Sequence, residues 1–98
     1  MAISNEQLAE LILGFAKSQN AIIEALTHHF GDGTAGTRFR DQYVTPTLHN
    51  YARIRDHAEN PTFEDLPAQV LWRLQGSHKA NDQPIKEWLE QELARLTS

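Results

Sequence analysis

The sequence contains no cysteine and no long apolar run. Without cysteine, the protein has no disulfides, no thiolate metal sites and no cysteine nucleophile. No stretch approaches the roughly 18 apolar residues that cross a bilayer, and no basic residue precedes Lys17, unlike a signal or transit peptide. We therefore expect a cytoplasmic protein that has no membrane partner and is stabilised by the packing of its side chains.

The sequence also has little excess of one charge sign over the other, because the formal net charge is only −4 over 98 residues. This mild negative charge disfavours long-range attraction to nucleic acid. The middle segment, residues 37–58, is the exception, since its four arginines outnumber its two aspartates. With 40% apolar residues the chain can build one hydrophobic core. We expect a single domain over residues 1–98.

The clearest local pattern predicts a long first helix. Ser4 and Gln7 form a capping box, so the helix should begin at Asn5, and Gly31 should stop it. If unbroken it would be roughly 39 Å long, more than the 30–35 Å expected across a compact domain of this size. Leu13 is predicted to lie on the polar side. The predicted buried stripe comprises Leu8, Ile12, Phe15, Gln19, Ile22, Leu26 and His29, widened by Leu11, Ala16, Ile23 and Phe30.

Small side chains accompany this stripe at the spacing of a helix surface. They would allow a second helix to approach closely. Two interpretations stay open: the small residues pack against a neighbouring helix of the same chain, or they form a seam for self-association. Gln19 fits either, because a buried amide can fix the register between paired helices. The candidate self-association residues are Gly14, Ser18, Gln19, Ala21 and Ala25.

Three further helices follow. A second helix is expected from Thr37, kinked or broken at Thr45-Pro46 and ended by Asn60-Pro61. The third fits residues 66–75 with Asp65 as its cap, and the last opens around residues 82–84. The last helix should bury Ile85, Trp88, Leu89, Leu93 and Leu96. The sequence thus predicts an all-α, bundle-like domain of about four helices: a long first helix, a kinked or broken second and two shorter ones.

Motifs that carry chemistry are missing. Gly31, Gly33 and Gly36 match a Gly-x-Gly-x-x-Gly pattern, but a helix precedes them where a dinucleotide-binding fold has a strand. The five histidines have no i, i+3 or i+4 pair that would hold a metal on a helix. No local group combines a nucleophile, a base and an orienting residue. We therefore expect no enzyme activity, no cofactor and no metal.

The remaining hypothesis is a non-enzymatic interaction or regulatory protein. Its protein partner is not identified by the sequence, and pairing of the first helix with a second copy would make a homodimer. The alternative is nucleic-acid binding by the middle segment, where guanidinium groups could contact phosphate and aromatic rings could stack on bases. Pairing of these arginines with acidic helices of the same chain would exclude that use. The residues of this surface are Arg38, Arg40, Tyr51, Arg53 and Arg55.

Overall fold

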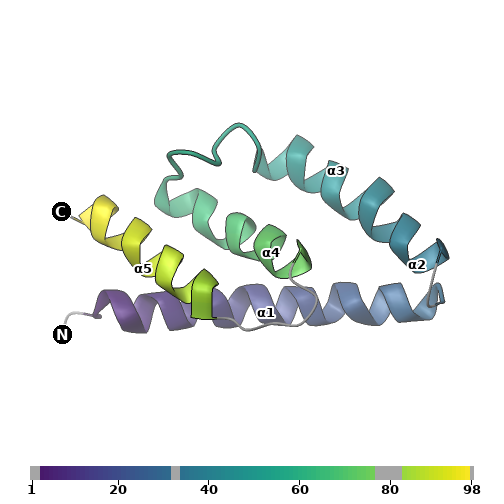
Figure 1. Cartoon of the computed structure of the whole chain (residues 1–98), viewed down its shortest axis with the longest axis horizontal. Coiled ribbons are helices and arrows are strands. Elements are labelled where there is room, and N and C mark those ends of the chain that lie inside the picture. The colour runs from purple at the N-terminus through teal and green to yellow at the C-terminus, as the bar shows by residue number, and fades with distance from the viewer. Residues whose placement is uncertain (1–2, 32–33, 77–82, 98) are drawn as a thin grey trace.

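The computed structural model describes residues 3–31, 34–76 and 83–97, and within these ranges the chain is helical with no strand. The predicted all-α, bundle-like fold is confirmed. Figure 1 shows the remaining helices on one side of the long first helix. The elements are α1 (Asn5–His29), α2 (Thr34–Phe39), η1 (Arg40–Val44), α3 (Thr45–Thr47), η2 (Leu48–Ala52), η3 (Phe63–Asp65), α4 (Leu66–Gly76) and α5 (Gln83–Thr97).

The two ends of α1 lie where the sequence predicts them. The backbone N–H of Gln7 donates to the Ser4 hydroxyl and the Ser4 N–H donates to the Gln7 side chain, both at 3.1 Å. These reciprocal bonds satisfy two donors that the first helical turn leaves without partners. At the other end Gly31 takes a φ of +101°, a conformation that glycine adopts at little cost.

The core forms where α4 and α5 pack against one face of α1. Ala9 and Ala16 are fully buried there and Leu13 is 7% exposed. The two alanines have short side chains, so α4 and α5 can come close to the α1 backbone. The residues of α4 and α5 in this core are Leu66, Val70, Leu71, Leu74, Ile85, Leu89 and Leu93.

The predicted orientation of α1 is therefore wrong in part. Phe15 and Ile22, expected in the core, are 61% and 64% exposed, whereas Leu13, expected outside, is buried. Leu8, Ile12 and Ile23 do pack against the core. The error has a physical cause: α1 is apolar on two sides, and the pattern of one helix does not tell which side its neighbours cover.

Residues 34–52 form one helical segment that Pro46 disturbs without breaking. Proline has no N–H to donate to the carbonyl four residues back. The ladder adjusts by shifting to π-type bonding on both sides of α3, and the Thr45 N–H bonds to the Arg40 carbonyl, five residues back. The helix starts before the predicted Thr37, and residues 37–45, for which the sequence is ambiguous, are helical.

The second helix ends earlier than predicted. Arg53 takes a left-handed conformation with φ of +52° and stops the helix, so residues 53–62 form a loop where the sequence predicts helix as far as Asn60. Ile54, predicted on the helix, is fully buried at the start of this loop. Nothing in the local sequence marks Arg53 as a terminator, because glycine is the usual residue in this conformation.

The packing of α2 against the end of α1 requires a glycine at position 36. A Cβ on Gly36 would lie 2.6 Å from the Gly31 carbonyl oxygen and 2.9 Å from Thr27 Cγ2. Only glycine therefore lets α2 contact the end of α1 this closely. Gly33 lies outside the described residues.

The other helices follow α1 along a molecule that is 45 Å long. Although the length of α1 suggested that it would extend beyond its domain, it does not.

The last two helices largely match the prediction. Thr62, rather than Asp65, caps the segment that leads into α4, and Asp65 is the residue that bonds back to it. Ile85, Leu89 and Leu93 are buried as predicted, with Trp88 and Leu96 partly so.

Leu13 and Leu11 give a direct test of how α1 is oriented. We expect Leu13→Ala to lower the free energy of unfolding by about 2–5 kcal/mol, because it opens a cavity in the core. Leu11→Ala, the same change on the exposed side, should cost below about 1 kcal/mol. Urea denaturation at low protein concentration measures both. A larger loss at Leu11 than at Leu13 would contradict this orientation.

Candidate functional site

The most distinctive surface of the structure is a second apolar face on α1. Leu11, Phe15 and Ile22 are 51%, 61% and 64% exposed, and Leu26 is 41% exposed. Residues two positions apart on a helix are separated by about 200° of rotation. Leu11 therefore points away from its neighbours Ala9 and Leu13 in the core, and the same holds for Phe15 relative to Leu13. We call Leu11, Phe15, Ile22 and Leu26 with the small residues between them the outer face.

All five candidate self-association residues are exposed on or beside this face. Within the described residues, an added Cβ at Gly14 would meet no atom within 4 Å. None of the described helices therefore covers Gly14, and the other small residues are exposed as well. Gln19 is also exposed, so its expected burial in the core is wrong. The five residues are Gly14, Ser18, Gln19, Ala21 and Ala25.

Charges lie mainly at the ends of the outer face. Glu6 and Glu10 are near its N-terminal end, where Lys86 of α5 donates to the Glu10 carboxylate at 3.2 Å and lies 3.7 Å from that of Glu6. The hydrogen bond to Glu10 raises the pKa of Lys86. His28 and His29 occupy the last turn, where positive charge complements the helix dipole. The middle of the face is apolar or neutral.

The arginines of the middle segment do not form one surface. Arg38 and Arg53 are about 20 Å apart along the helical segment, given a rise of 1.5 Å per residue. Arg40 pairs with Glu24 of α1 at 3.7 Å, and Arg53 contacts Asp56 at 2.8 Å. Arg55 lies 3.5 Å from His49. Tyr51, also on the predicted surface, is 87% exposed.

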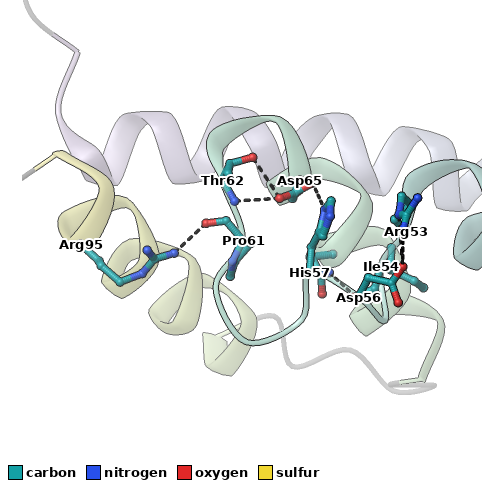
Figure 2. Close-up of polar contacts among 9 residues, drawn as sticks. Arg53, Ile54, Asp56, His57, Pro61, Thr62, Asp65 and Arg95 are labelled. Atoms are coloured by element: carbon teal, nitrogen blue, oxygen red, sulfur yellow. Dashed lines mark hydrogen bonds and ion pairs between the residues drawn. The ribbon is translucent and has the colours of Figure 1, made fainter.

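A polar network holds the loop between η2 and η3 in place (Figure 2). From α4, the Gln69 side chain donates to the Ile54 carbonyl at 2.6 Å, and from α5 the Arg95 guanidinium donates to the Pro61 carbonyl at 2.6 Å. Both ends of the loop are thereby fixed to the last two helices. His57 Nδ1 lies 2.7 Å from Asp65 Oδ1 beside a hollow of about 430 Å³.

A His–Asp pair beside a hollow can orient a general base, but here the Asp65 carboxylate mainly completes the capping box by accepting hydrogen bonds from the cap residue Thr62. Burial alone would raise the pKa of Asp65, yet hydrogen bonds from the Thr62 backbone and side chain and from His57 outweigh it, and the pKa is lowered. Arg53, which also lines the hollow, is paired with Asp56. This arrangement supports the loop and the start of α4.

The described part of the chain offers little else for chemistry. It contains no group of three or more His, Cys, Asp or Glu side chains placed to hold a metal ion. None of the helices in it is long and apolar enough to cross a membrane. An open apolar hollow of about 300 Å³ lies between the end of α1 and the 34–52 segment, lined by Ile23, Phe39, Tyr43, Val44, Thr47, Leu48 and Leu71.

Comparison with known proteins adds no family to this picture. No family model matches the chain, and no curated protein or solved structure shows significant similarity to it. Function therefore has to be argued from the surface itself.

The sequence analysis found the small residues of the outer face but assigned its large ones to the core. Leu11, Phe15, Ser18, Ile22 and Ala25 alternate at spacings of four and three, which is the pattern of a helix seam. This spacing pattern is present in the sequence beside the predicted buried stripe. The pattern gives no indication that α4 and α5 cover the other side of α1.

The cap at α4 predicts a pH-dependent stability. We expect Asp65→Ala to lower the free energy of unfolding by about 0.5–2 kcal/mol at pH 7, as the loss of a helix cap does. Because the pKa of Asp65 is lowered by folding, this stabilisation is present above the ordinary aspartate pKa and is lost as the pH falls below about 4. Urea denaturation at pH 7 and pH 3 should show the difference from wild type shrink. Glu64→Ala, an exposed acidic neighbour, is the control, and an equal pH response there would refute the assignment.

Proposed function

We propose that the protein is a cytoplasmic, non-enzymatic interaction protein that self-associates through α1. The observation that carries the proposal is the outer face, where Leu11, Phe15 and Ile22 are more than half exposed on one side of a rigid helix of 25 residues. Contiguous exposed apolar surface on a small protein usually marks an interaction site. The same helix is fixed on its other side by the core, so the face is presented without any rearrangement.

A helix is the partner that suits this face. The small residues beside the large ones leave the α1 backbone accessible, and the surface is convex and narrow, as a helix pairing seam requires. Burying the exposed half of each large side chain is worth about 1 kcal/mol. A symmetric pair buries eight such side chains, worth about 8 kcal/mol, against an association cost of roughly 4–15 kcal/mol. The two terms are close, so the association is expected to be reversible and concentration-dependent.

Nucleic-acid binding has less support from the geometry. A phosphate-binding surface needs several cations on one side, whereas Arg40 and Arg53 are paired with carboxylates at different ends of the segment. The exposed ring of Tyr51 alone does not make a stacking platform.

The proposal is tested by the oligomeric state of the protein and of two matched variants. We expect sedimentation velocity to show reversible self-association whose midpoint moves to higher concentration in Phe15→Glu, because a carboxylate would be buried in the seam. Phe63→Glu is the control: it introduces the same charge at another half-exposed phenylalanine, on η3. Circular dichroism should show unchanged helicity in both. A wild-type protein that stays monomeric over a wide concentration range would disprove self-association.

A further inference from the structure

The outer face has a shape that complements itself when one copy is reversed. Large and small side chains alternate about Ser18, the central residue of the face. Seven residues to either side of Ser18 stand Leu11 and Ala25, and four to either side stand Gly14 and Ile22. Three to either side stand Phe15 and Ala21. Leu11, Phe15 and Ile22 therefore each have a small residue at the mirrored position, whereas Leu26, at the end of the face, mirrors Glu10.

We infer that two copies pair through α1 in an antiparallel arrangement with Ser18 at the twofold axis. This inference rests on the proposed self-association and adds its orientation and register. In an antiparallel pair, Phe15 of one copy lies at the height of Ala21 of the other, and Ile22 lies at the height of Gly14. Leu11 likewise faces Ala25. Each of these three layers then holds one large and one small side chain, the arrangement that fills a seam evenly.

The parallel arrangement fits less well. It would bring each large side chain of the face against its own copy and each small side chain against its own copy. Layers of two large side chains and layers of two small ones would then alternate, so no single interhelical distance could fill the seam evenly. The antiparallel arrangement keeps one interhelical distance throughout, because the mixed layers have similar volumes.

Charge favours the same orientation. A parallel pair would place Glu6 and Glu10 beside the same carboxylates of the second copy. The antiparallel pair separates the two acidic N-terminal ends of α1 and places each beside the C-terminal end of the other helix. It also sets the two helix dipoles in opposition, which is the favourable alignment for neighbouring helices. The middle of the face is neutral in both arrangements and does not discriminate.

The structure leaves room for this pairing. The core lies on the opposite side of α1, and the other helices are on that side in Figure 1. At Gly14 no atom of the described residues lies within 4 Å of an added Cβ, so the position that would receive Ile22 of the second copy is open in this part of the structure. Ser18 bonds to the Phe15 carbonyl of its own helix at 2.8 Å, so its hydroxyl has a partner wherever it is placed.

Cysteine cross-linking tests the orientation directly, because the chain has no cysteine of its own. A disulfide needs Cα atoms within about 7 Å. In the antiparallel pair Leu11 is about 21 Å along the axis from its own copy but level with Ala25. We therefore expect a mixture of Leu11→Cys and Ala25→Cys chains to form a mixed disulfide dimer under mild oxidation. Leu11→Cys alone should not cross-link, and Gln91→Cys, on the exposed side of α5, controls for random collision.

The outcomes separate this inference from the proposed function. Efficient cross-linking of Leu11→Cys with itself would overturn the antiparallel arrangement while self-association through α1 would stand. A protein that sediments as a monomer at every concentration would remove both. A dimer that persists in Phe15→Glu and cross-links at none of these positions would place the contact elsewhere and would also remove both.

A swap of one layer tests the register without cysteines. Phe15→Ala leaves a hole and Ala21→Phe crowds two rings into one layer, so each change should weaken the dimer about tenfold or more. The double variant Phe15→Ala/Ala21→Phe restores one ring per layer, and we expect its dimer Kd to return close to that of the wild type. Additive losses in the double variant would show that the two positions do not face each other.

Discussion

The packing of α4 and α5 against Ala9, Leu13 and Ala16 is the contact on which the rest of the structure depends. The two alanines are fully buried and allow close approach, and Leu13 fills the space between the helices. Because two of the three buried α1 residues in this core are alanines, most of its large buried side chains come from the other helices. Leu66 and Val70 of α4 and Leu89 of α5 are fully buried and supply them.

The position of the central loop follows from this packing. Once α4 and α5 are fixed on α1, Gln69 and Arg95 hold the carbonyls of Ile54 and Pro61. The 34–52 segment is attached differently, through the close contact at Gly36 and a tilted ring contact between Phe30 and Phe39, whose centroids are 5.1 Å apart. Fewer buried side chains hold this segment than hold α4, so it is the part of the fold expected to open first.

Short-range patterns in the sequence predicted the features that depend on neighbouring residues alone. The capping box at Ser4, the stop at Gly31 and the buried leucines of α5 all lie where short-range patterns place them. Two features could not be predicted in this way. The left-handed Arg53 has no glycine or other terminator in the local sequence to mark it, and the orientation of α1 depends on which of two apolar sides the later helices cover. The sequence therefore predicted only half of the candidate seam. The spacing of the small residues identified them, whereas the large residues were identified only by their exposure in the structure.

An antiparallel seam would also explain how a helix with two apolar sides avoids open-ended association. A twofold pair uses the same surface on both copies, so each copy covers the outer face of the other and assembly stops at the dimer. A face that matched a different patch of the molecule would instead build chains of copies. The mirrored order of large and small residues about Ser18 makes the outer face complementary to itself, and the antiparallel orientation keeps the two acidic N-terminal ends of α1 apart.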